Sequence, residues 1–326
     1  MKIKTERKIQ TWPSWDLVYE WEDQFQKELD APFVYTKRHE RYINCIHWNV
    51  FSFSYSNDYE FMWNMGVLIK HSRYNRANIL PAIIDFHLSQ YQLNKFYKAY
   101  KKIPFILISS LEVVDFLREN NCPKQIYHFP LSLPDKYKIT PTTRFEKEFD
   151  LVLMGRTNIV FDGYLKKYVE KHQNFTYVYE QQGNKFHYFT SKGEYIGNIN
   201  NRKSYIELMR KSKIWLYSTP GIDGGEERTK GFNQVTPKFL ELLSCGCHVI
   251  VRYKKNSDTD YYQLDKFCSN IETYEQFEKE MDKARSTEVD MKMYSEYLEN
   301  HYTSKRVELF KTILEKENIA WEKLPS

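Results

Sequence analysis

The sequence has little that would support a disulfide framework, a zinc site or a membrane span. Its cysteines are odd in number and form no C-x-x-C pair: Cys45, Cys122, Cys245, Cys247 and Cys268. This pattern argues against disulfide bonds and bound zinc, and it favours a reducing compartment. No signal peptide and no apolar run of membrane-spanning length is visible. We therefore expect a cytoplasmic protein, with peripheral contact to the inner face of a membrane as an option.

A strong charge of one sign is missing as well. The 48 Lys and Arg residues outnumber the 43 Asp and Glu residues by only five, and they are spread along the chain. So mild and diffuse an excess suits an anionic substrate or an anionic membrane surface, but it argues against nucleic-acid binding. Internal repeats and low-complexity tracts are absent. With 41% hydrophobic residues, the chain can build a packed core, which excludes wholesale disorder.

Aromatic residues are abundant, at 17% of the chain, and they include 26 tyrosines. Such a content suits a protein that stacks on rings or on the faces of sugars. The Lys, Asn, Tyr and Ile bias of an AT-rich genome explains it equally well, so both interpretations stay open. The length of 326 residues allows one large domain or two of ordinary size.

The second half of the chain alternates between strand and helix patterns. The apolar run 149–155, which ends in Gly, predicts a buried parallel strand and its tight exit turn. The segments 175–180, 214–218 and 248–253 read as further strands. Helical patterns lie between them, at 164–172 and 204–213. The Gly-punctuated segment 183–195 predicts a hairpin or a loop. Alternation of this kind predicts a doubly wound parallel sheet.

The first half is less regular. Strand patterns occur at 43–55, 79–85, 105–109 and 125–135, the last running into a Pro-rich turn, and 111–120 is an amphipathic helix. The polar segment 136–148 has no apolar periodicity and reads as a linker. We therefore divide the chain into an N-terminal domain, 1–140, and a C-terminal domain, 141–326. A long terminal helix over 298–317 is expected to pack back on the N-terminal domain.

The segment VTPKFLELLSCGCHVI, at 235–250, carries the strongest functional signal. Thr236 is a good N-cap, Pro237 suits the first helical position, and Gly246 suits the left-handed residue that closes a helix. The free N–H groups and positive dipole end of such a helix are how α/β proteins hold phosphates. Lys238, in the first turn, opposes that dipole unless an anion lies nearby. The pattern therefore predicts a nucleotide diphosphate at the start of this helix.

Lys238 and Glu241 lie together on the face of this helix opposite to the apolar one. The apolar face comprises Phe239, Leu240, Leu242 and Leu243. Glu241 is not a capping-box residue, because Phe239 holds the third helical position. The alternative to a functional pair is a solvated Lys–Glu pair, which would contribute about 0.2–0.5 kcal/mol.

The second half resembles the GT-B glycosyltransferases, specifically the group 1 family that uses nucleotide-sugar donors. FDLVLMGRTN resembles the first strand of the family's C-terminal domain, whose Gly-Arg exit turn lies near the donor diphosphate; this implies that Gly155 and Arg156 bind the donor. YIGNI and then YIELMRKSKIWLYSTPG look like the family's strand, Gly, helix and strand before the donor site. GFNQVTPKFLELLSCGCHVI resembles the segment whose glutamate binds the nucleotide ribose, a place that Glu241 occupies.

The resemblance implies an α/β protein with the GT-B fold, in which two Rossmann-like domains face a central cleft. It also implies transfer of a sugar from a UDP- or GDP-sugar donor to a saccharide or lipid-linked acceptor, in bacterial surface polysaccharide synthesis. The nucleotide-sugar is then a substrate, and no cofactor and no metal are expected.

The sequence departs from the family in places. Many members carry a second glutamate eight positions before the first, and Asn233 stands there in this chain. Glu226 or Glu227, in the Gly-rich loop 221–231, would then supply the contact to the donor sugar. That loop reads as a lid over the donor or as a plain surface loop. The VT-x-K-then-Gly pattern also resembles inverting α-1,3-fucosyltransferases, so a retaining or an inverting outcome is open.

The proposed chemistry needs the leaving diphosphate to be stabilised. Arg156, Lys238 and the amides after Thr236 would form the clamp, since fixed N–H donors and cations can act without a metal. Glu241 would accept from both ribose hydroxyls. The alternative for Arg156 is an exposed surface arginine.

Asp85 and His87 come straight after the strand ILPAII, at 79–84, where α/β sheets place ligands outside their carboxyl ends. The His would bind the donor sugar, and the Asp would take a proton from the acceptor hydroxyl. The alternative is a loop Asp with a packing His. His47, in an aromatic strand, is expected in the core.

Asp258 and Asp260 spell a D-x-D, which we interpret as a solvated turn rather than a Mn²⁺ site. Two other functions stay open: a nucleotide-sugar epimerase on the same fold, and a non-catalytic partner subunit.

Overall fold

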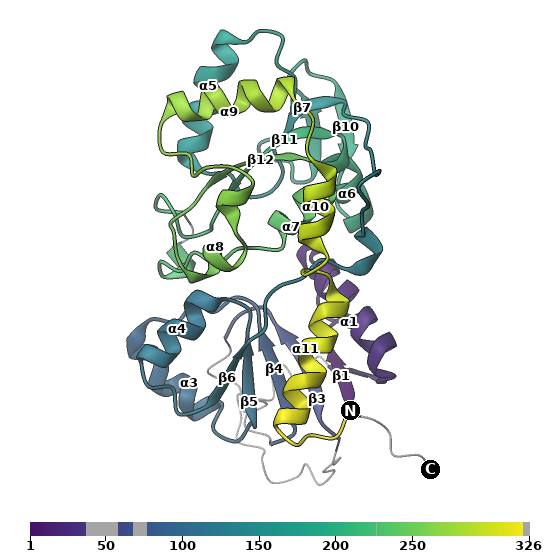
Figure 1. Cartoon of the computed structure of the whole chain (residues 1–326), viewed down its shortest axis with the longest axis vertical. Coiled ribbons are helices and arrows are strands. Elements are labelled where there is room, and N and C mark those ends of the chain that lie inside the picture. Colours follow the sequence, from purple (N-terminus) through teal and green to yellow (C-terminus); the bar gives the residue numbers. More distant parts are fainter. Residues whose placement is uncertain (37–57, 68–76, 226, 322–326) are drawn as a thin grey trace. The chain divides into compact units, whose positions relative to one another are not determined.

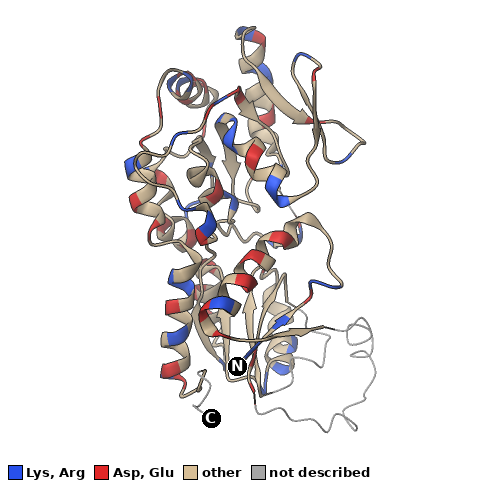
Figure 2. Ribbon diagram, turned by 90° about the vertical axis from the view of Figure 1, so that its right-hand side faces the viewer, with Lys and Arg blue, Asp and Glu red and all other residues tan. Residues whose placement is uncertain are grey.

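The computed structural model describes residues 1–36, 58–67, 77–225 and 227–321 (Figure 1). The contacts within it divide the chain into two units. Unit 1 comprises Met1–Asp135, Arg228–Phe232 and Tyr302–Ser326, and unit 2 comprises Lys136–Glu227 and Asn233–His301. The chain thus passes from unit 1 to unit 2 slightly before position 140. In Figure 2 the positions of basic and acidic residues alternate along the ribbon of both units.

Unit 1 contains a six-stranded sheet in the order β2-β1-β3-β4-β5-β6, with every neighbouring pair parallel. The strands are β1 (Lys2–Thr5), β2 (Phe33–Tyr35), β3 (Glu60–Asn64), β4 (Ile79–Ile83), β5 (Phe105–Ile108) and β6 (Gln125–His128). The strand order reverses between β1 and β3, which makes that position the topological switch point of this sheet.

Two apolar clusters cover the two faces of this sheet. Successive residues of a strand point to opposite faces, so Phe61 and Trp63 join one cluster and Met62 joins the other. α1 (Asp16–Leu29) and α11 (Thr303–Lys316) pack on the first face, and α3 (Leu93–Ala99) and α4 (Leu111–Glu119) on the second. β4 and β5 are buried along their whole length, as strands covered on both faces should be.

The terminal helix is interrupted. The predicted helix over 298–317 was wrong in its first part, because α10 (Met291–Leu298) ends there and α11 begins at Thr303. Tyr302 is extended and forms a parallel bridge with Leu133, whose carbonyl accepts from the N–H of Thr303. This backbone pairing with a segment far away in sequence competes with the helix. α11 itself packs against α1.

Unit 2 contains the second six-stranded sheet, in the order β10-β9-β8-β7-β11-β12. The strands are β7 (Phe149–Val152), β8 (Tyr177–Glu180), β9 (His187–Thr190), β10 (Tyr195–Asn198), β11 (Ser212–Ser218) and β12 (His248–Arg252). β8, β7, β11 and β12 pair in parallel, which confirms the predicted doubly wound sheet. The hairpin or loop predicted at 183–195 contains β9 and the turn after it, and the antiparallel strand β10 begins at its last residue. The switch point lies between β7 and β11.

The helices of unit 2 include α5 (Ile159–Lys171), α6 (Arg202–Arg210), α7 (Lys238–Ser244), α8 (Ser257–Tyr261) and α9 (Tyr274–Ser286). α7 ends as predicted at Gly246, which has a φ of +63°. The N–H groups of Gly246 and Cys247 donate to the carbonyls of Leu243 and Leu242, which is a Schellman motif. No helix in the described ranges is long and apolar enough to cross a membrane.

Candidate functional site

Two predicted cations meet at the switch point of unit 2. β7 and β11 run in parallel, so the loops that follow them start side by side at the carboxyl edge of the sheet. Lys238 Nζ donates to the Met154 carbonyl in the first of these loops, at 2.8 Å. Arg156 Nη2 donates to the carbonyl of Ser218, the last residue of β11, at 2.5 Å. The structure therefore brings Gly155, Arg156 and Lys238 together, and their contact with a donor stays a prediction.

The two cations act on each other. Burial and the nearby positive charge of Arg156 lower the pKa of Lys238 to about 8, against the opposing effect of the Glu241 carboxylate. The backbone carbonyls that hold the two groups carry only partial charge. An anion placed here would therefore gain from both cations and would raise the pKa of Lys238 again.

Gly155 is suited to this position by its conformation and by its size. Its φ is +74°, and a Cβ there would lie 3.1 Å from Nζ of Lys238. Only glycine adopts such a conformation without steric cost and leaves the ammonium group in place.

We expect Gly155→Ala to weaken UDP binding about tenfold or more, because it displaces the Lys238 ammonium in addition to straining the backbone by about 1–2 kcal/mol. Gly193→Ala is the matched control, since Gly193 has a φ of +87° and nothing within 4 Å of its Cβ position. Thermal unfolding of both variants measures the effect of backbone strain on stability, and isothermal titration measures the effect on UDP affinity. Equal UDP affinities in the two variants would contradict the proposed contact.

Glu241 is buried, with 3% of its surface exposed, and Glu241 Oε1 pairs with Arg202 Nη2 at 2.6 Å. The interpretation of Lys238 and Glu241 as a solvated surface pair is therefore wrong. The Arg202 guanidinium also lies over the Tyr137 ring, at 5.3 Å from its centre. Arg202 was not predicted from the sequence. It is the first residue of α6, as Lys238 is of α7, and a positive charge at this position opposes the helix dipole. The contact of Glu241 with ribose stays a prediction.

Thr236 does not cap α7 with its side chain, which corrects the sequence analysis. The N-cap residue is Pro237, and the Thr236 hydroxyl lies 3.3 Å from the Tyr217 hydroxyl. The N–H of Thr236 donates to the same Tyr217 hydroxyl at 2.9 Å, and that of Phe239 to the Thr236 carbonyl. α7 is short and some of the N–H groups expected for phosphate already have partners. Anion binding must then depend mainly on Lys238 and Arg156, and a donor contact by Thr236 stays a prediction.

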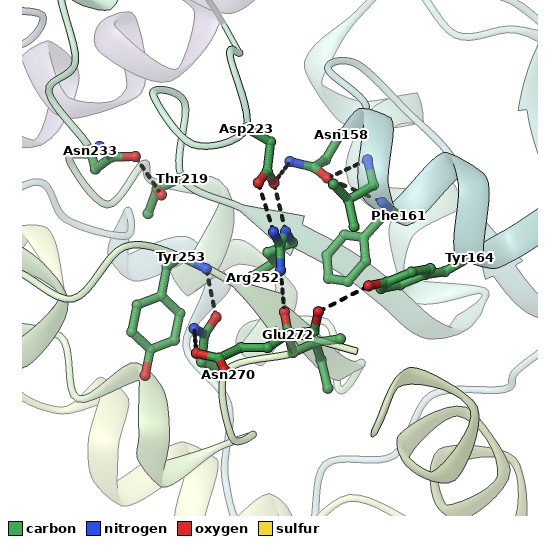
Figure 3. A network of polar contacts seen from close by, with 12 residues as sticks. Asn158, Phe161, Tyr164, Thr219, Asp223, Asn233, Arg252, Tyr253, Asn270 and Glu272 are labelled. Carbon is green, nitrogen blue, oxygen red and sulfur yellow. Dashed lines mark hydrogen bonds and ion pairs between the residues drawn. The ribbon is translucent and has the colours of Figure 1, made fainter. Parts of the chain in front are cut away.

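A network of polar contacts fixes the loops at this edge of the sheet (Figure 3). Both carboxylate oxygens of Asp223 accept from Arg252, at 2.6 and 2.7 Å, and one also accepts from Asn158 Nδ2 at 2.8 Å. Asn158 Oδ1 in turn caps α5 by accepting from two backbone N–H groups. The hydrogen bond from Arg252 lowers the pKa of Asp223. The loops after β7 and β11 are thereby tied to the end of β12.

We expect Arg252→Ala to lower the free energy of unfolding by about 1.5–3 kcal/mol, because it leaves a half-buried carboxylate with fewer donors. Lys255→Ala is the control: its pair with Asp260 spans 3.7 Å between largely exposed side chains and should contribute about 0–1 kcal/mol. Urea unfolding of the two variants and the wild type measures both values. If Arg252→Ala lowers the free energy of unfolding by less than Lys255→Ala does, the network does not stabilise the fold.

The first part of the Gly-rich segment 221–231 is held by hydrogen bonds and close packing, which a mobile lid would lack. Asp223 is held by the network, and a Cβ on Gly225 would lie 2.4 Å from the Pro220 carbonyl oxygen. Further along, Arg228–Phe232 belongs to unit 1, where the Phe232 ring packs edge-on against Phe116. Glu227 begins a one-turn 3-10 helix, and its donor-sugar contact stays a prediction. Glu226 lies outside the described residues.

A cavity of about 360 Å³, open to solvent, lies beside Gly155. It is formed by residues that follow β7 and β8, together with the end of β8: Leu153, Gly155, Thr157, Tyr179, Glu180, Gln181, Gln182, Gly183 and Lys185. Its volume falls in the range of small-molecule sites. These residues after β8 were not predicted from the sequence, although they follow a strand of a parallel sheet just as Asp85 follows β4.

Asp85 and His87 lie in unit 1, directly after β4, as predicted from the sequence. Both side chains are half-buried, while Phe86 between them is buried and packs edge-on against Phe96 at 5.3 Å. They therefore line the carboxyl edge of the unit 1 sheet, and their catalytic roles stay predictions.

The polar residues near the start of α7 have structural partners. Asn233 is buried, and its Oδ1 accepts from the Thr219 hydroxyl at 2.9 Å. Asp258 is completely buried and accepts from the N–H of Val235 at 2.5 Å, so the prediction of a solvated turn was wrong for it, whereas Asp260 is exposed. Within the described ranges, no group of three or more His, Cys, Asp or Glu residues could hold a metal. His47 lies outside them.

No protein-family model and no curated protein sequence matches the chain. Solved structures do. The pneumococcal O-GlcNAc transferase GtfA, solved with UDP and GlcNAc, matches with a TM-score of 0.53 and 13% identity over 80% of this chain and 58% of that one. TarM from S. aureus, solved with fondaparinux, α-GlcNAc-glycerol and UDP, matches with a TM-score of 0.48 and 11% identity over 78% of this chain and 55% of TarM. T4 phage BGT, solved with UDP and Mn²⁺, matches with a TM-score of 0.49 and 10% identity over 98% of this chain and 100% of BGT.

The match to GtfA and the topology of the two sheets show that the chain has the GT-B fold, which confirms the fold prediction. The chain spans less than three fifths of GtfA and of TarM. Identities this low carry the fold alone, so the activity has to be argued from the site.

Proposed function

We propose that this chain is a glycosyltransferase that moves a sugar from a nucleoside-diphosphate donor to a saccharide or lipid-linked acceptor. One observation carries the proposal. Lys238 and Arg156 converge at the β7–β11 switch point of a GT-B fold, each held by a backbone carbonyl, and the neighbouring Gly155 lines a cavity of nucleotide-compatible size. α/β sheets bind their ligands at such a switch point.

The two cations would stabilise the departing diphosphate. As the bond between sugar and phosphate breaks, negative charge grows on the phosphate oxygens. A guanidinium can bind two of these oxygens side by side, and the ammonium of Lys238 supplies a second full charge. Both groups are already in place before the reaction, so they need no costly rearrangement as charge develops. This chemistry requires no metal ion, and we propose metal-independent transfer.

The cavity beside Gly155 would hold the nucleoside. Tyr179 offers an aromatic wall for a base, and the amide groups of Gln181 and Gln182 offer donors and acceptors for its edge. Glu241, oriented by its pair with Arg202, would accept a ribose hydroxyl with its second oxygen. UDP and GDP donors both fit this description.

For the acceptor, Asp85 would take the proton from the reacting hydroxyl, and His87 would bind the donor sugar. A role in bacterial surface polysaccharide synthesis, in the cytoplasm with peripheral contact to the membrane, completes the proposal.

Donor hydrolysis tests the site assignment. The release of UDP from UDP-glucose and UDP-N-acetylglucosamine should fall about 10²–10³-fold in Lys238→Ala, and it should also fall in Glu241→Ala. If both variants hydrolyse the donor at the wild-type rate, the assigned site is wrong. Conversion of the donor sugar to its epimer, with no acceptor present, would show an epimerase instead. UDP binding without turnover on any acceptor would show a non-catalytic partner, which the replacement of a family glutamate by Asn233 allows.

A further inference from the structure

The outer part of the unit 2 sheet carries a contiguous row of aromatic rings. In the β8–β9–β10 ladder, Tyr179 lies opposite Phe189, and Phe189 lies opposite Tyr195. Residues directly opposite each other, and residues two apart on a strand, project from the same face of a sheet. We call this face the aromatic face; its residues are Tyr177, Tyr179, His187, Phe189 and Tyr195.

The aromatic face is open to solvent, whereas the other face of the same strands is covered. Val178, Tyr188 and Thr190 are buried on the covered face. On the aromatic face no ring is buried, and Tyr179 and Tyr195 are 37% and 54% exposed. Single exposed aromatics are ordinary on protein surfaces, but a contiguous exposed patch marks an interaction site.

Hydrogen bonds hold the rings of His187 and Tyr195 in position. The Asn198 amide donates to Nε2 of His187 at 3.2 Å, which places the ring proton on Nδ1. Nδ1 lies 2.8 Å from the Tyr195 hydroxyl and donates to it, so the O–H of Tyr195 stays available as a donor. The two rings stack at 5.8 Å, and Phe189 packs against Tyr195 at 5.0 Å. A surface fixed in this way loses little conformational entropy on binding.

The charges around the face select the class of ligand. The segment from Tyr177 to Asn198 contains two lysines, Lys185 and Lys192, and two glutamates, Glu180 and Glu194. Nucleic acids need an excess of basic residues along their backbone, and anionic membranes attract basic clusters. This balanced surface offers neither. Flat rings with polar rims instead match a sugar ring, which has C–H groups on its faces and hydroxyl groups around its edge.

The row also continues into the candidate site. Tyr179 belongs to the aromatic face and at the same time lines the cavity beside Gly155. We propose that the aromatic face binds an uncharged oligosaccharide, with Tyr195 and Tyr179 as the main stacking residues. This binding does not require the proposed transferase activity, and it explains part of the aromatic content of the chain.

Titration of the whole chain with maltohexaose and with chitohexaose tests the proposal. We expect at least one of them to bind with a Kd of about 1 mM or tighter. Tyr195→Ala and Tyr179→Ala should each weaken that binding about tenfold, while Tyr195→Phe, which keeps the ring, should retain most of it. Tyr91→Ala is the matched control, because Tyr91 is 82% exposed and belongs to unit 1. Thermal unfolding of each variant shows that it is folded.

The proposal is overturned if neither hexasaccharide binds, or if Tyr195→Ala and Tyr179→Ala both bind like the wild type and the Tyr91 control. It is also overturned if oligothymidylate or phosphatidylglycerol vesicles bind in a Tyr195-dependent way and the saccharides do not. UDP titration of Tyr195→Ala keeps the two proposals apart. Loss of saccharide binding with unchanged UDP affinity supports the aromatic face, and a wild type that binds saccharide but not UDP contradicts only the proposed transferase.

Discussion

Replacing Lys238 by methionine should weaken UDP binding at least about a hundredfold and leave the stability of the protein unchanged or improved. The ammonium group is one of two cations at the β7–β11 switch point, and a charge-assisted contact to a diphosphate at a fixed, partly desolvated position is among the strongest a site can make. Stability should not suffer, because burial and the charge of Arg156 already disfavour the charged form of this lysine.

Lys203→Met is the matched control for this substitution. Lys203 lies on α6, its side chain is 87% exposed, and its pair with Glu207 spans 3.9 Å. Isothermal titration with UDP and thermal unfolding of both variants measure the two effects separately. A Lys238→Met protein that is folded and binds UDP as tightly as the Lys203→Met protein would remove Lys238 from the site.

UDP binding should also weaken as the pH rises above about 8. The pKa of Lys238 is lowered to about 8 from the ordinary lysine value of 10.5, so the free protein loses this charge above pH 8. The bound diphosphate favours the charged form and raises the pKa in the complex. Affinity should therefore stay level well below pH 8 and fall about fivefold between pH 8 and pH 9 in excess of any change due to the base.

Lys238→Met supplies the reference for this pH series, because ionisation of the uracil base affects both proteins equally. The stability of the free protein should change in the opposite sense. An unfolded lysine keeps its proton up to pH 10.5, so the cost of burying the charge is present below pH 8 and is relieved between pH 8 and 10.5. Parallel pH profiles of UDP affinity in the two proteins would contradict the account.

The parts of the fold that the sequence predicts well depend on local pattern. β4 and β5 are short apolar runs and are buried throughout, and Gly246 closes α7 in the left-handed conformation that its position implies. β1 was not predicted, because Lys2 and Lys4 give its sequence a charged pattern. The strand nevertheless lies inside the sheet, between β2 and β3. Lys4 is nonetheless 7% exposed, since its ammonium pairs with Glu60 at 3.3 Å. A partner so far away in sequence leaves no local signal.

The same limit applies to the candidate site. Lys238 was singled out because it opposes a helix dipole, and Arg156 because the segment after β7 resembles the Gly-Arg turn of the family. The partners of Glu241, Thr236 and Asp258 were missed because each comes from another element: Arg202 from α6, Tyr217 from β11 and the Val235 backbone from the loop before α7. Buried polar groups must be paired, but the sequence alone does not say with what.

The most direct test compares UDP with uridine, since the two differ only in the diphosphate. Both ligands are titrated into the wild type and into the double variant Arg156→Met, Lys238→Met. The account predicts that the wild type binds UDP at least about a hundredfold more tightly than uridine and that the double variant loses this difference. A wild type that binds uridine as well as UDP, or a double variant that keeps the preference for UDP, would contradict a diphosphate site between these two cations.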